Sequence, residues 1–344
     1  MMRKLLNVLY VNTPESYLSL EGENVVVLIQ NKESFRVPAH NLENIVCFGF
    51  MGASPALMGF CAEKGIGLCF INPYGNFLAS ISGPVKGNVL LRKKQYKISE
   101  EDQHSLSISR NIILGKLNNS RAVIERGIRD HEDKVDATLL KDVSTHIKEG
   151  IENVRRANSI EKIRGIEGDC ARAYFSAINE LILCQKEYFY MKERSKRPPK
   201  DNFNALLSFL YTLLAQEVQN ALESVGLDPY VGFFHTDRPG RASLAMDIME
   251  EFRAFLVDRL ALSLINRRQI SEKGFVTKES GGVLMEYDTR KEVLTAWQKR
   301  KQETISHPFL GDKIEAGLLP YVQALLLARY LRGDIEEYPP FLWK

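Results

Sequence analysis

The stretch Asp228–Arg253, DPYVGFFHTDRPGRASLAMDIMEEFR, joins a turn-rich loop to the start of a helix. A Pro/Gly turn presents His235, and the apolar spacing from Ser243 onward predicts the helix. Asp247 and Glu250 are three residues apart, which places them on one face of that helix. An imidazole on a loop opposite two helical carboxylates is a candidate donor set for a divalent metal. The rest of the chain must then supply a further ligand, a substrate surface and a scaffold.

Length and composition indicate an ordinary globular protein. The 344 residues are enough for two domains. Hydrophobic residues make up 44% and charged residues 26%, a balance typical of soluble proteins. The formal net charge is only +3, so overall charge does not indicate a nucleic-acid binder. Any basic surface must come from local clusters.

The cysteines and the N-terminal sequence both indicate the cellular compartment of the protein. The five cysteines form no CxxC pair and lie mostly in apolar runs, which predicts free thiols in a reducing compartment and excludes a disulfide framework or a zinc site. The basic and apolar start MMRKLLNVLYVN breaks at Asn12, too early for a signal peptide, and no apolar run has membrane-spanning length. We therefore expect a cytoplasmic protein without membrane association.

The predicted fold class is α+β with two domains: a small N-terminal β-sheet domain, residues 1–84, and a larger all-α C-terminal domain, residues 85–344. In the first domain two apolar runs flank Glu21–Asn24, which predicts a hairpin. Ser54 followed by a proline predicts the start of a short helix that ends at Gly65. This domain shows no chemistry-bearing cluster, so we expect it to act as a scaffold or a subunit contact.

Helical periodicity dominates the second domain. Ser105–Arg129 carries apolar residues at helical spacing, and cations such as Lys116 between them form either a solvated helix face or a DNA contact. A further amphipathic helix is predicted over Glu152–Ile163, ending at Gly165. Glu167 follows between two glycines, and it is either an accessible ligand or a helix-start acid favoured by the dipole.

The remaining elements follow from the same patterns. They are a core helix over Ala205–Ser224, an unbroken helix from Ser243 to Asn266–Arg268, a hairpin over Phe275–Tyr287 and a buried last helix over Leu318–Leu331. The acidic and aromatic tail DIEEYPPFLWK either docks a partner or packs on the domain.

Basic residues gather in two loops. Tyr188–Asp201 interleaves aromatic and basic side chains, including Arg197 and Lys200, which suits a nucleic-acid strand or a solvated linker equally. Arg238 and Arg241 follow His235 and are candidates to hold a DNA backbone. We take these four cations as the candidate DNA-binding residues.

Glu167, His235 and Glu250 together make a site of one imidazole and two carboxylates, with Asp247 beside it. Hard oxygen donors with one imidazole suit Mg²⁺ or Mn²⁺. Such a metal stabilises the charge that develops on a phosphate during its transfer, so phosphodiester chemistry is the natural reaction. By spacing alone, surface charge is the commoner explanation of these residues.

Three segments carry a family resemblance. GIEGDCARAYF, RPPKDNFNALLSFLYTLL and GLDPYVGFFHTDRPGRASLAMDIMEEFR, together with the β-then-α layout, resemble the CRISPR-associated Cas-one integrase family. The resemblance covers essentially the whole chain, and the motifs occur in the family's order. The ending EYPPFLWK is similar to the form found beside type I-C systems.

The resemblance implies an N-terminal β-domain that forms a homodimer and a helical domain that holds one metal. It implies Glu167, His235 and Glu250 as catalytic metal ligands, with Asp247 as the neighbouring catalytic acid. Many relatives have Asp at the position of Glu250, which reaches one methylene further. The implied partner is the small Cas-two protein, with two dimers of the larger subunit bridged by one dimer of the smaller.

The implied function is spacer acquisition in CRISPR adaptation. The 3′-hydroxyl of a short DNA fragment attacks a phosphodiester at the repeat boundary by metal-dependent transesterification. The same site would cleave branched DNA. Two other readings stay open: a noncatalytic DNA-binding scaffold whose acids only cap helices, and a structure-specific DNA endonuclease of repair or recombination.

Overall fold

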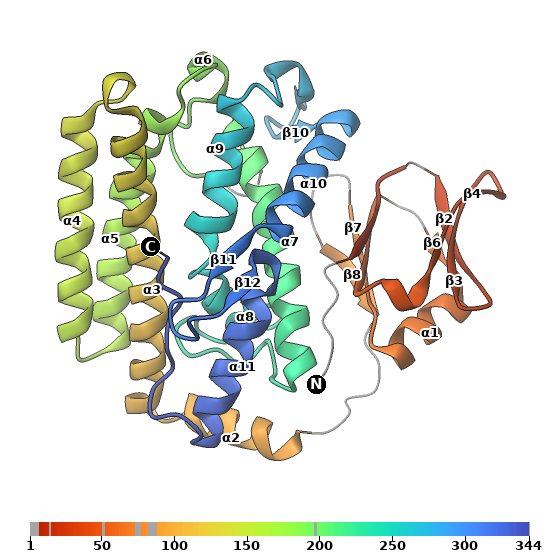
Figure 1. The fold of residues 1–344 in the computed structure, drawn as a ribbon, viewed down its shortest axis with the longest axis horizontal. Coiled ribbons are helices and arrows are strands. Elements are labelled where there is room, and N and C mark those ends of the chain that lie inside the picture. The colour runs from red at the N-terminus through yellow and green to blue at the C-terminus, as the bar shows by residue number, and fades with distance from the viewer. Residues whose placement is uncertain are drawn as a thin grey trace. The chain divides into compact units, whose positions relative to one another are not determined.

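The computed structural model describes residues 7–13, 15–49, 52–72, 77–81, 88–195 and 198–343. The chain divides into two compact units, Met1–Gly87 and Asn88–Lys344. The first is built of β-sheets and the second is mostly helical (Figure 1), so the predicted α+β class is confirmed. The predicted domain boundary at residue 84 lies outside the described residues.

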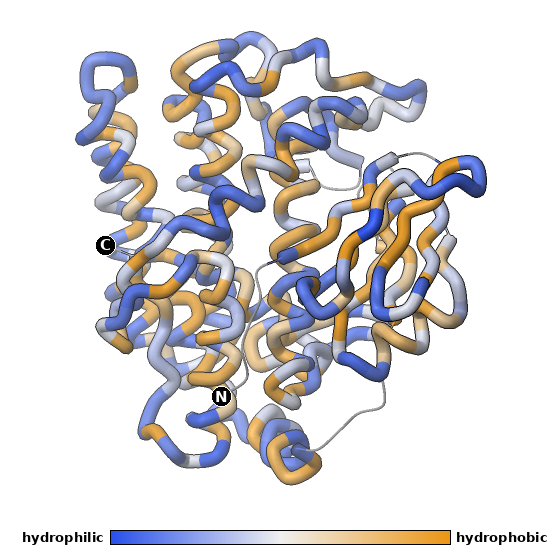
Figure 2. Tube along the Cα trace, turned by 45° about the vertical axis from the view of Figure 1, so that its right-hand side comes forward, coloured by the Kyte–Doolittle hydropathy of each residue, from blue (hydrophilic) through white to orange (hydrophobic). Residues whose placement is uncertain are grey.

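Two four-stranded sheets form the first unit. One sheet has, in spatial order, β1 (Val8–Val11), β5 (Asn44–Phe48), β7 (Gly67–Ile71) and β8 (Phe77–Ile81). The other has β4 (Lys32–Pro38), β3 (Asn24–Ile29), β2 (Ser16–Glu21) and β6 (Gly52–Ala53). Hydrophobic residues concentrate along these strands (Figure 2).

The sequence signals in this unit correspond to real elements. β2 and β3 pair antiparallel around the predicted turn, where Gly22 takes a φ of 60° that a glycine adopts without strain. Helix α1 (Pro55–Lys64) begins where Ser54 Oγ accepts a hydrogen bond from the Leu57 amide at 3.2 Å. It ends at Gly65 in the left-handed conformation, as predicted.

The helical unit contains the following main elements. They are α2 (Val89–Ser99), α3 (Asp102–His131), η2 (Glu132–Lys134), α4 (Ala137–Arg156), α5 (Ile160–Ala177), α6 (Lys186–Phe189), α7 (Asn202–Val225), α8 (Ser243–Met249), η4 (Arg253–Asp258), α9 (Arg259–Asn266), α10 (Tyr287–Gln302) and α11 (Leu319–Arg332). Two small hairpins interrupt them, β9 (Phe275–Thr277) with β10 (Val283–Met285), and β11 (Thr304–Ser306) with β12 (Lys313–Glu315). The unit is therefore not entirely α, and the second hairpin was not predicted. Among the described residues, none of the helices is long and apolar enough to cross a membrane.

Helices α3, α4 and α5 pack side by side (Figure 1). The predicted helix end at Gly165 is wrong: α4 ends at Arg156, Ser159 caps α5, and α5 continues through both glycines. A glycine inside a helix costs about 1 kcal/mol relative to alanine. The buried face of α5, with Cys170 and Tyr174, outweighs that cost. Glu167 therefore lies in the middle of a helix and is not a helix-start acid.

The predicted unbroken helix from Ser243 is also interrupted. Helix α8 ends at Met249, a turn follows, and η4 is a π-helix that leads into α9. π-Helical turns are rare and frequently occur at functional sites. The turn lets the two neighbouring carboxylates Glu250 and Glu251 contact different groups of residues.

The C-terminal tail packs on the helical unit. Phe341 is fully buried, and its amide donates a hydrogen bond to Glu251 Oε2 at 2.6 Å. The Tyr338 hydroxyl donates to the other oxygen of Glu251 at 2.5 Å. Asn119 of α3 binds the Phe341 carbonyl and the Trp343 amide at 2.9 and 2.8 Å. The tail thus forms part of the core beside the turn that carries Glu250.

Asp258 gives a pH prediction. It is buried at the end of η4, where Tyr174 and Tyr211 donate hydroxyl hydrogen bonds at 2.9 and 2.5 Å. Burial raises the pKa of Asp258 to about 6, against the two hydroxyl donors and nearby arginines that lower it. The folded state then binds more protons than the unfolded state between about pH 4 and 6, so this carboxyl lowers stability as pH rises through that window.

Asp258→Asn should remove that slope. The free energy of unfolding of wild type relative to the variant should fall by roughly 2 kcal/mol from pH 4 to pH 6 and level off above about pH 7. Urea unfolding at half-unit pH steps measures it. A wild-type minus variant difference that does not change with pH would contradict the raised pKa.

Candidate metal centre

The loop that carries His235 is built around one buried carboxylate. Asp247 of α8 is fully buried, and its Oδ2 accepts hydrogen bonds from the Phe233 and Phe234 amides at 2.7 and 3.0 Å. Its Oδ1 accepts from the His235 amide at 2.9 Å and contacts His235 Nδ1 at 2.6 Å. Gly232 makes this approach possible, because a Cβ there would lie 2.8 Å from Ser243 Cβ. The interpretation of Asp247 as a surface charge is wrong.

Asp247 therefore orients the imidazole. Because Nδ1 of His235 is engaged by the carboxylate, Nε2 is the ring nitrogen left for a further ligand. Arg164 of α5 fixes the same loop by donating to the Phe234 carbonyl at 2.9 Å. Asp247 on α8 and Arg164 on α5 together fix the position of the His235 imidazole.

Glu167 and Glu250 meet at a shared cation. The Lys116 ammonium of α3 contacts Glu167 Oε1 and lies 2.7 Å from Glu250 Oε2. Arg253 of η4 donates to Glu250 Oε1 at 2.7 Å. The side chains are largely enclosed, with exposed fractions of 18% for Glu167, 12% for Lys116 and 4% for Glu250. Two carboxylates, one on α5 and one in the turn after α8, are thus within reach of one ammonium group.

The charges of this group are strongly coupled. Burial alone would raise the pKa of Glu250, but Arg253 and Lys116 outweigh it and lower the pKa to about 2, with a smaller contribution from His235. Burial would lower the pKa of Lys116, but Glu250 and Glu167 outweigh it and raise the pKa. The Glu250 carboxylate is therefore ionised at neutral pH and attracts a cation.

Comparison with known proteins identifies the family. The family model described as CRISPR associated protein Cas1 matches residues 9–299. A protein of Chlorobaculum tepidum named CRISPR-associated endonuclease Cas1 1 is 49% identical over 343 residues, which cover 100% of both chains. The chain belongs to the Cas1 family. The type I-C subtype does not follow from these matches.

Solved structures share the fold of this Cas1 chain. A casposase bound to integration product superposes with a TM-score of 0.84 at 21% identity, covering 98% of this chain and 94% of the other. A chain of a Cas6-RT-Cas1–Cas2 complex gives a TM-score of 0.84 at 21% identity, covering 100% of this chain and 37% of the other. At these identities the likeness establishes the Cas1 fold alone.

The Cas1 family implies a metal-dependent nuclease, so the residues must be tested against a metal. Across the described ranges, no three His, Cys, Asp or Glu side chains are arranged as a metal-binding group. The donor types nevertheless fit. Glu250 Oε2 is buried and makes no hydrogen bond of good geometry despite its 2.7 Å distance from Lys116, and Glu167 faces the same ammonium. Lys116 supplies the positive charge that these oxygens require.

The predicted DNA-binding residues that the structure describes are exposed or partly buried. Arg238 is exposed and Arg241 is partly buried, in a turn where the Arg241 amide donates to the Arg238 carbonyl at 3.0 Å. Lys200 is exposed, 3.7 Å from Glu193. Arg197 lies outside the described residues.

Sequence reasoning missed two cations of the site. Lys116 was expected on a solvated helix face or at DNA, but it is largely buried between two carboxylates. Arg253, which holds Glu250, stacks at 4.6 Å over the Tyr211 ring. Its spacing three residues after Glu250 is the one signal that could have suggested it.

Proposed function

We propose that this Cas1-family chain is a nuclease and integrase of CRISPR spacer acquisition that joins the 3′-OH ends of short DNA fragments to the repeat. The observation that carries the proposal is the convergence of Glu167 and Glu250 on one buried cation, with His235 held by Asp247 on the adjoining loop. Family membership supports it, because the relatives are named CRISPR-associated endonucleases.

Glu167, His235 and Glu250 would hold one divalent metal, Mg²⁺ or Mn²⁺. When bound, such a metal activates a hydroxyl nucleophile and stabilises charge on the transferring phosphate. Asp247 keeps Nε2 of His235 oriented, and Arg253 fixes one oxygen of Glu250. His235 then serves as a ligand, and the reaction needs no covalent intermediate on the protein.

The proposed partners are DNA and the small Cas2 protein. A relative in fold comes from a Cas1–Cas2 complex and another is bound to an integration product. We propose that the β-sheet unit forms a homodimer and that two dimers flank one Cas2 dimer. The β-sheet unit shows exposed Tyr17, Phe35 and Phe77 side chains, which supports a contact role.

A strand-transfer assay tests the function. Wild-type chain with Cas2, Mn²⁺, a labelled DNA fragment and a repeat-containing duplex should yield a joined product, and a fragment lacking its 3′-OH should yield none. DNA binding without joining would favour the scaffold, and cleavage of branched DNA without joining would favour a repair endonuclease.

The basic loop gives a separate prediction. Arg197→Ala with Lys200→Ala should weaken DNA binding and reduce the slope of log K against log salt by about 1.8 on duplex DNA, since each lost phosphate contact removes about 0.9. Fluorescence anisotropy at several NaCl concentrations measures it. A slope equal to that of wild type would assign Tyr188–Asp201 to a solvated linker.

A further inference from the structure

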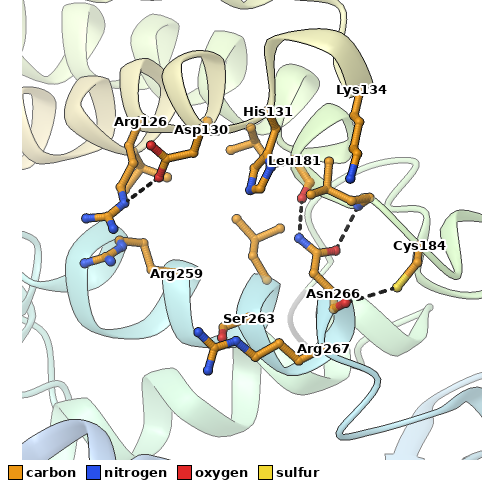
Figure 3. Close-up of a pocket in the computed structure, with 14 residues that line it drawn as sticks. Arg126, Asp130, His131, Lys134, Leu181, Cys184, Arg259, Ser263, Asn266 and Arg267 are labelled. Carbon is orange, nitrogen blue, oxygen red and sulfur yellow. Dashed lines mark hydrogen bonds and ion pairs between the residues drawn. The ribbon is translucent and has the colours of Figure 1, made fainter.

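A positively charged site lies in the helical unit, apart from the candidate metal centre. A pocket of about 660 Å³ is bounded by the C-terminal part of α3, η2 and α9. Arg126 and Lys134 come from one wall and Arg259 and Arg267 from the other (Figure 3). Asp130 is the one carboxylate among the lining residues that the structure describes. With histidine neutral, the pocket carries a formal charge of +3, as much as the whole chain.

Three of the four pocket cations are not neutralised by the residues that the structure describes. Asp130 already binds Arg126 at 3.0 Å and Arg129 at 3.1 Å. Within the described ranges, the side chains of Lys134, Arg259 and Arg267 make no hydrogen bond or ion pair. Burial, and then the like charges of nearby arginines, lower the pKa of Arg259 to about 9. An anion in the pocket would relieve this repulsion.

Helix capping does not explain these cations. Positive side chains at a helix C-terminus commonly bind its last carbonyls. At the end of α9, however, Cys184 Sγ donates to the Ile265 and Asn266 carbonyls at 3.2 and 3.5 Å, and Gln185 donates to the Ile265 carbonyl at 3.2 Å. The pocket cations are therefore available to a ligand.

The pocket is held in shape by the C-terminal tail. Arg259 stacks 4.2 Å from the Trp343 ring centroid and 5.6 Å from that of Phe255, and Arg126 lies 5.8 Å from Trp343. A guanidinium fixed by an aromatic ring is pre-organised for a phosphate. Gly127 lets Leu181 close the apolar floor, since a Cβ there would lie 2.3 Å from Leu181 Cδ2.

The lining offers positive charge rather than a free amide side chain. The Asn266 amide is already used, with its Nδ2 donating to the Leu181 carbonyl and its Oδ1 accepting from the Leu183 amide, both at 2.8 Å (Figure 3). Lys134 and Arg267 are exposed at the rim, so a strand can enter. Exposed cations at a pocket rim suit sequence-independent backbone binding.

We propose that this pocket binds a phosphate of a nucleic-acid strand through Lys134, Arg259 and Arg267. It is separate from the candidate metal centre, because Arg126 lies about 15 Å beyond Lys116 along α3 at 1.5 Å per residue. The proposal rests on the proposed function in DNA processing and adds a second anchoring point for the strand. A free mononucleotide is the other source of the same phosphate chemistry, since the volume also suits one.

Lys134→Gln with Arg267→Gln tests the proposal, because both side chains are exposed and unpaired. Binding of a labelled mixed-sequence single strand by the full chain is followed by anisotropy in EDTA, which prevents chemistry. The slope of log K against log salt should fall by about 0.7, the share of one phosphate contact on a single strand, which corresponds to about 5-fold weaker binding at 0.1 M salt. The matched control, Lys148→Gln with Arg329→Gln, removes the same charges from exposed positions on α4 and α11 and should keep the wild-type slope.

Equal slopes for the pocket variant and the wild type would overturn the proposal. A second result would also overturn it. If the wild type binds dAMP and the pocket variant does not, while the variant's salt slope for DNA is unchanged, the natural ligand of the pocket is a free nucleotide. Strand transfer by the wild type is measured separately. If the wild type transfers strands but the pocket variant keeps the wild-type salt slope, the pocket proposal fails while the proposed function stands.

Discussion

Glu167→Ala, His235→Ala and Glu250→Ala should each reduce strand transfer to below about one hundredth of wild type while DNA binding persists. Loss of residues that only support metal ligands typically costs 10–100-fold, so loss of a ligand should cost at least as much. The three side chains come from α5, a loop and the end of α8, and no other described carboxylate contacts Lys116. Product formation with a labelled fragment and anisotropy on the same DNA measure the two quantities.

The matched control for Glu167→Ala is Glu161→Ala. Both residues lie on α5 and both changes remove one negative charge, but Glu161 is exposed on the first turn. The control should transfer strands at the wild-type rate. Equal activity of Glu167→Ala and the control would rule out Glu167 as a ligand.

Phe341→Ala should lower the free energy of unfolding by about 3–5 kcal/mol, the usual cost of truncating a buried phenylalanine to alanine. Phe341 is fully buried, with ring centroids of Phe252, Phe255 and His307 at 5.9, 5.5 and 5.9 Å. The expected fall in Tm is on the order of 10 °C. Calorimetry of the full chain measures it.

Leu342→Ala is the control for the tail. Leu342 is the next residue but is 36% exposed, so its truncation should change stability by less than about 1 kcal/mol. Similar Tm values for Phe341→Ala and Leu342→Ala would contradict the packed tail. Because Glu251 binds the tail and is the residue next to Glu250 in the turn, Phe341→Ala should also weaken binding of the proposed metal.

Much of the fold was predictable because local chemistry decides it. Ser54 and Gly65 delimit α1, and Gly226 ends α7 in the left-handed conformation that only glycine adopts freely. His235, Asp247 and Glu250 are close in sequence, so a loop and one helix suffice to bring them near each other. Glu167 is distant in sequence, and only its two flanking glycines and its carboxylate chemistry marked it as a candidate ligand before the family resemblance was considered.

The remainder depends on tertiary packing that spacing does not encode. The glycines beside Glu167 suggested a helix end, but packing of α5 on α4 keeps the helix intact. The π-helix η4 breaks a periodic apolar run without a proline or glycine. Lys116 looked like any surface cation, and only the fold places it between two carboxylates.

Glu167, His235 and Glu250 are proposed to hold one divalent metal. Titration of the full chain with Mn²⁺, with free Mn²⁺ measured by electron paramagnetic resonance, tests it most directly. We expect one tight Mn²⁺ per wild-type chain and its loss in Glu167→Gln and His235→Ala, with Glu161→Ala unchanged. Full Mn²⁺ occupancy in both ligand variants would contradict it.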